Sequence, residues 1–277
     1  MKNNILVALN DLERPSELSE YGTHLGKTLE RPVCLFSITK VPLYTPPVIT
    51  DGQTANTLTM EIKELQNQSD VQLNAICLAA KTLYQEVTYS IDIGFTEPTI
   101  LEKAEKQNPH LVVLEGQNEL STVNEWFGTY ETRLAESTSV PALVVPKGYP
   151  WKPVNKVLYI MDMNDEKVEN MRYLSNLCKE LRARLIVVTL TDGEVNDNDE
   201  RYLNTTKTFR ELLGYDNIEF QKVYANDLAN ATDRMLEKTE AGWLAFEHKD
   251  RSFLERMMDS YNTKHLILQS DKPVLVF

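Results

Sequence analysis

Cysteine is scarce in this chain of 277 residues, and the three cysteines do not form a motif. Cys34, Cys77 and Cys178 lie far apart, and no pair has the C-x-x-C spacing of a redox or zinc site. An odd count with scattered positions argues against a disulfide framework and favours a reducing compartment. Long apolar runs are also missing, since no stretch reaches the ~20 residues that a membrane-spanning helix needs. The first residues lead directly into a strand-like segment, with no signal-peptide pattern. We therefore expect a cytoplasmic protein without a membrane partner.

Motifs that carry catalytic chemistry are absent as well. The four histidines, His24, His110, His248 and His265, are widely separated, and no H-E-x-x-H metal motif occurs. The sequence contains neither the G-x-S-x-G elbow of α/β-hydrolases nor a Walker-type phosphate loop. These absences predict no metal site and no catalytic residues, and they favour a protein that is not an enzyme.

Positive charge is in short supply. There are 29 Lys and Arg against 41 Asp and Glu, which gives a net charge of −12 and a pI near 4.9. An acidic chain lacks the basic surface by which proteins bind nucleic acid or anionic membranes, so we expect neither partner. Hydrophobic residues make up 42% and charged residues 25%, as in ordinary globular proteins. The length suggests about two domains at ~150 residues each.

The chain contains a repeat at the scale of half its length. Ile5–Leu9 is a short apolar run followed by Asn10 and Asp11, and residues 157–161 form a similar run followed by Asp162. Apolar runs of this length are typical of strands buried on both faces. Each half also ends in a proline followed by an apolar strand, at residues 141–145 and 273–277. The Gly- and Pro-containing segment 147–153 lies between them. We therefore place one domain at residues 1–147 and the other at 154–277.

Strands and helices alternate within each half. The long second helix of the first half is predicted from Leu58, Ile62, Leu65, Leu73, Ile76, Ala80 and Leu83. In the first half we predict strands at 5–9, 33–38, 87–93, 111–114 and 140–145, and helices at 18–29, 58–83, 98–107 and 126–134. In the second half we predict strands at 157–161, 185–190, 218–224, 243–246 and 272–277, and helices at 168–178, 202–213, 228–236 and 253–261. This alternation predicts two tandem three-layer α/β/α domains, each with a five-stranded, mostly parallel sheet.

This order of elements resembles the universal stress protein family, which has the adenine nucleotide alpha hydrolase-like fold. The two terminal strands and the turn Gly94-Phe-Thr-Glu-Pro98 strengthen the resemblance, which covers both halves. It implies a tandem two-domain form in which the halves pack as an intramolecular pseudo-dimer about a pseudo-two-fold axis. Because edge strands pair readily, we expect residues 142–145 to pair with residues 274–277. A homodimer of the whole chain is an additional possibility, and protein partners are unknown.

The resemblance also implies where a nucleotide would bind. Many members bind ATP through an aspartate after the first strand and a loop after the fourth strand that reads Gly-x2-Gly-x9-Gly-Ser/Thr. Such a loop lets backbone N–H groups approach phosphates at the start of a helix. In the first half these positions are Asn10 with Asp11, Glu115, Asn118, Gly128 and Thr129. In the second half they are Asp162, Glu247, Asp250, Ser260 and Tyr261.

Neither half keeps the whole family pattern. A glutamate facing a phosphate at ~4 Å would cost roughly 4 kcal/mol per charge pair at an effective dielectric near 20. This cost, together with the missing glycines, argues against ATP binding as in the family. Lys249 and Arg251 in the second loop could still hold an anion. The candidate residues around the two clefts are Asn10, Asp11, Val41, Glu115, Gly116, Gly128, Thr129, Asp162, Glu247, Lys249, Arg251 and Ser260.

Three functions are consistent with these observations. The resemblance favours a non-enzymatic, stress-related regulatory or binding protein with degenerate nucleotide sites. The alternative is an ATP- or adenine-nucleotide-binding stress protein with one altered site. An unrelated enzyme on the same architecture is the third, because a fold does not determine a function.

Overall fold

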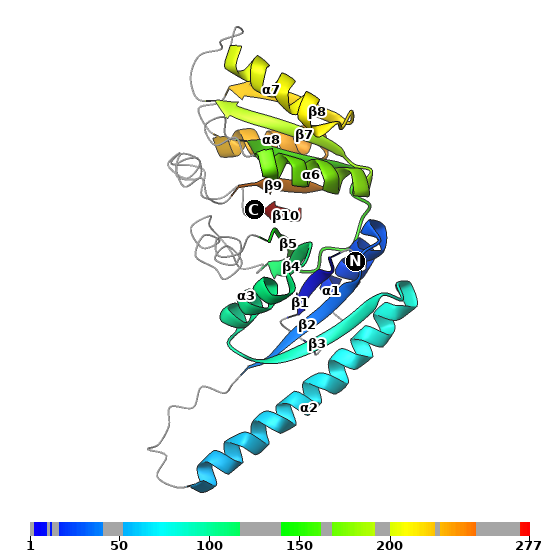
Figure 1. The fold of residues 1–277 in the computed structure, drawn as a ribbon, viewed down its shortest axis with the longest axis vertical. Helices are drawn as coiled ribbons and strands as arrows, with labels where there is room; N and C mark the ends of the chain where they lie inside the picture. The colour runs from blue at the N-terminus through cyan, green and yellow to red at the C-terminus, as the bar shows by residue number, and fades with distance from the viewer. Residues whose placement is uncertain are drawn as a thin grey trace. The chain divides into compact units, whose positions relative to one another are not determined.

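The computed structural model describes residues 3–9, 12, 17–40, 52–116, 140–161, 168–191, 200–224, 228–247 and 272–277. In this part of the chain, strands and helices alternate as the sequence predicts (Figure 1). The chain divides into two compact units, Met1–Glu115 and Gly116–Phe277. The expected last helix of each half, at 126–134 and 253–261, lies outside the described residues.

Unit 1 contains a parallel sheet with the strand order β3-β2-β1-β4. Its strands are β1 (Ile5–Leu9), β2 (Val33–Lys40), β3 (Val87–Gly94) and β4 (Leu111–Gly116, whose last residue falls in unit 2). Its helices are α1 (Glu17–Leu29), α2 (Gly52–Leu83) and α3 (Thr96–Gln107). All five residues of β1 are buried, as expected for a strand covered on both faces.

Helices cover both faces of this sheet. A Cβ added to Gly22 or Gly26 of α1 would come within 2.4 Å of Val7 or 2.1 Å of Val33, so α1 packs closely on β1 and β2. On the opposite face, the Lys103 ammonium of α3 lies 4.9 Å from the centre of the Phe36 ring. The small residues in α1 therefore serve helix–sheet packing, because larger ones would force the layers apart.

Unit 2 contains a sheet with the order β5-β10-β9-β6-β7-β8. Its strands are β5 (Ala142–Pro146), β6 (Lys156–Met161), β7 (Arg184–Thr191), β8 (Ile218–Tyr224), β9 (Trp243–Phe246) and β10 (Val274–Val276). Its helices are α6 (Val168–Leu181), α7 (Glu200–Leu213) and α8 (Leu228–Thr239). The strands from β10 to β8 are parallel to their neighbours, in the same order as those of unit 1.

The last strands of the two repeats pair with each other, which confirms the pairing expected from the sequence. β10 is antiparallel to β5, and Leu275 lies opposite Leu143 at the centre of the register. Both side chains are fully buried. Because β5 is held by β10, unit 2 includes the final strand of the first repeat. The repeat boundaries at 147 and 154 remain a sequence-based prediction.

The apolar residues that predict the long helix α2 are not all buried. Leu73, Ile76 and Ala80 are in the core. Leu65 and Leu83 are each 39% exposed. Under helical periodicity both lie about 60° or more from the centre of the buried face, so the apolar pattern alone overestimates the core of this helix.

Candidate functional site

The carboxyl ends of the parallel strands are the expected ligand site in this fold, and in unit 2 a buried carboxylate lies there. Glu247 directly follows β9 and is only 8% exposed. The hydroxyl of Tyr159, in the neighbouring strand β6, donates a hydrogen bond to Glu247 Oε1 at 3.0 Å. Burying a carboxylate is costly unless donors compensate it, and Tyr159 provides one.

Aromatic rings surround this pair. The Phe277 ring makes edge-to-face contacts with Tyr159 at 6.3 Å and with Tyr173 of α6 at 5.7 Å. The Phe277 amide also donates to the carbonyl of Phe246 at 3.4 Å. Edge-to-face pairs at these distances are favourable. Tyr159, Tyr173, Glu247 and Phe277 thus form one cluster, which we call the Tyr159–Glu247 cluster.

Strand registers show that this cluster is specific to the second repeat. Ile5 pairs with Leu111 in the first repeat as Val157 pairs with Trp243 in the second. By the same count along the strands, Glu115 corresponds to Glu247, as the spacing from the terminal prolines predicts. Tyr159, however, corresponds to Val7. The fully buried Val7 side chain has no hydroxyl to offer Glu115.

Three of the residues predicted for the clefts are described: Glu247, which follows β9, and Glu115 and Gly116, which end β4. Glu115 is half-buried, and a Cβ at Gly116 would lie 3.2 Å from Val144 Cγ1. The absence of a side chain at Gly116 therefore allows its backbone to lie close to Val144, within unit 2. The other predicted residues lie outside the described residues, so their placement stays a prediction; they are Asn10, Asp11, Val41, Gly128, Thr129, Asp162, Lys249, Arg251 and Ser260.

The carboxyl group of Glu247 does not face solvent, whereas a glutamate at this position was expected to face a phosphate. The Tyr159 hydroxyl draws it into the protein. Direct contact with a phosphate is then reduced, but a buried carboxyl group still occupies the position at which the sequence pattern has a glycine.

Tyr159, Tyr173 and Phe277 were not among the residues predicted from the sequence to lie near Glu247. One signal was available: Tyr159 is a polar-tipped residue in an otherwise aliphatic strand, where the first repeat has Val7. The pairing with Glu247 joins residues 88 positions apart, so it depends on the strand register.

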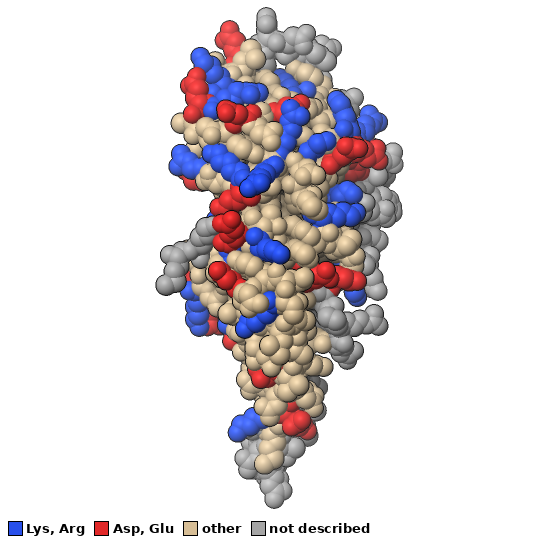
Figure 2. Space-filling model, turned by 90° about the vertical axis from the view of Figure 1, so that its right-hand side faces the viewer, with Lys and Arg blue, Asp and Glu red and all other residues tan. Residues whose placement is uncertain are grey.

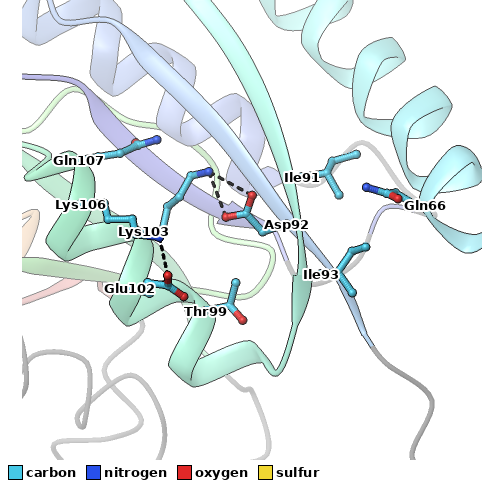
Figure 3. A pocket seen from close by; sticks show the side chains of 9 residues that line it. All are labelled: Gln66, Ile91, Asp92, Ile93, Thr99, Glu102, Lys103, Lys106 and Gln107. Atoms are coloured by element: carbon cyan, nitrogen blue, oxygen red, sulfur yellow. Dashed lines mark hydrogen bonds and ion pairs between the residues drawn. The ribbon is translucent and has the colours of Figure 1, made fainter. Parts of the chain in front are cut away.

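A cavity of about 550 Å³ lies in unit 1, beside the outer strand β3 (Figure 3). It is lined by Gln66, Ile91, Asp92, Ile93, Thr99, Glu102, Lys103, Lys106 and Gln107. Lys103 donates to both carboxylate oxygens of Asp92, at 3.1 and 3.3 Å, and its side chain is 14% exposed. Asp92 and the Phe36 ring together hold this partly buried ammonium in place.

The charges in this cavity are balanced. Lys106 donates to Glu102, which lowers the pKa of Glu102 and raises the pKa of Lys106. Two ammonium groups and two carboxylates therefore line the cavity as ion pairs. This lining suits a neutral polar molecule better than an anion such as a nucleotide phosphate, because binding an anion would have to break one of these pairs.

The described residues show no grouping of His, Cys, Asp and Glu that could hold a metal ion. All three cysteines are buried, and burial raises the pKa of Cys178 to about 12 and also raises that of Cys77. A thiol with so high a pKa is a poor nucleophile at neutral pH. Within the described part of the chain, no helix is long and apolar enough to cross a membrane.

Comparison with known proteins identifies the fold. No family model matches the sequence, and no curated protein matches it. Among solved structures, a universal stress protein from Archaeoglobus fulgidus superposes with a TM-score of 0.63 at 13% identity, covering 99% of this chain and 95% of that one. A Pseudomonas aeruginosa protein described as a universal stress protein gives a TM-score of 0.56 at 14% identity, with 100% and 93% covered.

The cytoplasmic domain of a prokaryotic cation chloride cotransporter is also similar, with a TM-score of 0.53 at 14% identity and 100% and 95% of the two chains covered. At such low identity, these similarities establish the fold and not the activity. Coverage of nearly the whole chain confirms the resemblance that the repeated element order suggested. The chain therefore has the α/β fold of universal stress proteins, in a tandem form with ten strands in the described residues.

Proposed function

We propose that this protein is a non-enzymatic, stress-related regulatory or binding protein whose nucleotide sites are degenerate. The observation that carries the proposal is the Tyr159–Glu247 cluster. In the family pattern the position of Glu247 belongs to a glycine whose backbone approaches the phosphates. Here the position carries a buried carboxylate anchored to Tyr159.

Charge makes this position unfavourable for a phosphate even with the carboxylate turned inward. At a separation of about 6 Å and an effective dielectric near 20, one like-charge pair costs roughly 3 kcal/mol. This cost corresponds to a roughly hundredfold weaker affinity for the phosphate. In the first repeat, Glu115 occupies the corresponding position. We therefore assign the function of this chain to recognition of other molecules, proteins among them, and not to ATP binding.

An adenine-nucleotide site in the second repeat is the second candidate. The burial of Glu247 favours it, because the carboxyl group accepts from Tyr159 and is turned away from solvent. The sequence adds Lys249 and Arg251 nearby, which could balance a phosphate. This candidate corresponds to a stress protein with one altered site.

Thermal denaturation with increasing ATP, with and without magnesium, distinguishes the two candidates. A ligand that binds only the native state raises the melting temperature in a saturable manner. We expect no saturable rise up to millimolar ATP. A rise that Lys249→Ala removes would instead place a competent site in the second repeat. A rise that Thr129→Ala removes would place it in the first.

A further inference from the structure

The outer strand β3 of unit 1 has one edge without a partner strand (Figure 1). β3 pairs with β2 over all eight of its residues, without a bulge. Just before β3, the carbonyl of Glu86 accepts from the amide of Val33 in β2 at 2.8 Å. Because the backbone groups of a parallel strand alternate in direction, those of Tyr89, Ile91 and Ile93 then point away from β2. Among the described residues, these groups have no hydrogen-bond partner.

The cavity in unit 1 lies along this free edge. It is lined by three consecutive residues of β3, Ile91, Asp92 and Ile93, and successive side chains of a strand point to opposite faces of the sheet. A cavity that touches both faces of an outer strand must pass around its free edge. Figure 3 shows Asp92 on the side of α3, and Ile91 and Ile93 on the side of α2 with Gln66. We call this cavity of about 550 Å³ the β3 edge groove.

The two sides of the β3 edge groove differ in polarity. The α2 side has Ile91, Ile93 (43% exposed) and the uncharged Gln66, and Figure 2 shows few charged side chains over α2, at its lower end. The α3 side carries the two ion pairs described above. A strand added along the edge would direct alternate side chains to these two sides. Apolar side chains fit the α2 side. Neutral polar side chains fit the α3 side, because a charged one would compete with the ion pairs.

The equivalent edge in the second repeat, that of β8, is protected against strand addition. Through the strand registers, Ile91 of β3 corresponds to Lys222 of β8. The Lys222 ammonium lies 5.8 Å from the centre of the Tyr202 ring and 4.9 Å from that of Tyr224. A lysine on an outer strand discourages the addition of a further strand. β3 has no lysine and no proline, and its one charged residue, Asp92, is held in an ion pair. The edge of β3 is therefore open to a partner in a way that the edge of β8 is not.

Charge restricts the partner further. In the described residues of unit 1, Asp and Glu outnumber Lys and Arg. An acidic segment would therefore be repelled, and so would a second copy of this chain, which carries a net charge of −12.

We propose that the β3 edge groove binds an extended segment of a partner protein, which adds to the sheet as a strand beside β3. The segment alternates apolar residues, which face α2, with neutral polar residues, which face α3, and it carries no net negative charge. Hydrogen bonds to the backbone of Tyr89, Ile91 and Ile93 supply affinity, and the two sides of the groove supply the sequence preference. This binding does not depend on the nucleotide sites, so its failure and the failure of the proposed function are distinguishable.

NMR titration of the full chain with the peptide acetyl-Lys-Thr-Val-Thr-Val-Thr-Lys-amide tests the inference. We expect saturable binding with a Kd below about 1 mM. Amide hydrogen exchange should slow at Tyr89, Ile91 and Ile93, which gain partners, and change little at Thr88 and Ser90, which already face β2. A peptide of the same composition without the alternation, acetyl-Lys-Val-Val-Thr-Thr-Thr-Lys-amide, should bind at least about tenfold more weakly, because its side chains no longer match the two sides of the groove.

Substitutions on β3 test the site of binding. Ile91→Lys gives β3 the side chain that β8 has at this position and should weaken binding at least about tenfold. Ile93→Pro removes an amide that points away from β2 and leaves the pairing with β2 intact, so it should weaken binding while the chain stays folded in thermal denaturation. Tyr224→Pro, at the equivalent position of β8, is the matched control and should leave the affinity for the peptide unchanged.

Three results would overturn the inference: no saturable binding, equal affinity for the two peptides, or unchanged exchange at the three outward amides when the peptide binds. Slower exchange at these amides with rising protein concentration, in the absence of peptide, would overturn it as well, because a second copy of the chain would then occupy the groove.

Discussion

At the scale of residues, the Tyr159–Glu247 pair is the feature that most clearly separates the two repeats. A buried carboxylate depends on its donors, since an unsatisfied charge is far more costly than an unsatisfied hydroxyl. Where the second repeat has Tyr159, the first has Val7. The ends of the equivalent strands β4 and β9 are therefore chemically different in the two repeats.

Replacing Tyr159 with phenylalanine should destabilise the protein. The change removes the hydrogen bond to Glu247 while keeping the ring against Phe277, so we expect a loss of about 1–3 kcal/mol in the free energy of unfolding. Urea denaturation measures it. Adding Glu247→Gln to Tyr159→Phe should recover part of the loss, because the buried charge is then absent. If Tyr159→Phe costs no more than ~0.3 kcal/mol, the hydrogen bond is not important for stability.

The raised pKa of Cys178 predicts that the protein becomes less stable as the pH rises above about 8.5. Burial raises its pKa to about 12, whereas an unfolded thiol has a pKa of about 8.5. Above the unfolded pKa, the unfolded chain loses this proton and the folded chain keeps it. The stabilisation is therefore complete below about pH 8.5 and is lost as the pH rises toward 12, by up to ~1.4 kcal/mol per pH unit.

Urea unfolding at several values between pH 8 and pH 10.5 measures this dependence. Cys178→Ala should show a shallower decline with pH than the unsubstituted chain, whatever its effect on stability at pH 7. Cys34→Ala serves as a control for the general effect of removing a thiol. Equal slopes in Cys178→Ala and the unsubstituted chain would contradict the prediction.

At the scale of elements, the helix ends show the repeat most clearly. Glu30 and Arg182 follow α1 and α6 in the left-handed conformation, with φ of 51° and 58°. Asn108 and Glu240 follow α3 and α8, with φ of 42° and 51°. Such positions favour glycine, or asparagine in its absence, because a side chain crowds the backbone there.

Glycine at the end of α8 should therefore stabilise the protein. Glu240→Gly removes the strain of a side chain in the left-handed region, and we expect a gain of about 1 kcal/mol in thermal or urea unfolding. Asn108→Gly, at the equivalent position after α3, is the matched control and should gain less, because asparagine tolerates this conformation. Equal gains at the two positions, or a loss at Glu240, would contradict this explanation.

Most elements could be predicted from sequence periodicity alone. The predicted strands 218–224 and 243–246 coincide with β8 and β9. The first residues of β8 alternate between apolar and polar, as in a half-buried strand, and β9 is a short apolar run. β2 continues two residues beyond its prediction, to Lys40, because pairing with β3 extends to that residue. α3 begins at Thr96 and not at Pro98, since proline is tolerated within the first turn.

The candidate site was less predictable than the fold. Counting from the terminal prolines correctly placed Glu115 and Glu247 at equivalent strand ends, because the repeats keep the same length there. The orientation of Glu247 could not be predicted, since it depends on a tyrosine in a neighbouring strand. The exposure of Leu65 and Leu83 on α2 could not be predicted for a similar reason: an apolar residue on a helix does not reveal whether anything covers it.

At the scale of the whole molecule, the antiparallel pairing of β5 with β10 joins the two repeats. It explains why a compact unit includes Ala142–Pro146, which belong to the first repeat by sequence. If the chain is cut between the two repeats, the two fragments should therefore remain associated through the pairing of β5 with β10.

A protease site inserted after Gly148 tests this joining. After cleavage we expect the two fragments to elute together in size-exclusion chromatography and to separate only in denaturant. Leu143→Asp should release them, because it places a charge in the fully buried centre of the β5–β10 pair. Fragments that separate without this substitution would show that the strand pairing does not hold the repeats together.

The central claim is that this tandem universal stress protein fold carries degenerate nucleotide sites and acts by binding other molecules. Isothermal titration calorimetry of ATP with magnesium into the full chain tests it most directly. We predict no saturable heat up to about 1 mM ATP, which corresponds to binding weaker than roughly −4 kcal/mol. A saturable isotherm with one ATP per chain would contradict the claim and show that Glu115 and Glu247 do not prevent nucleotide binding.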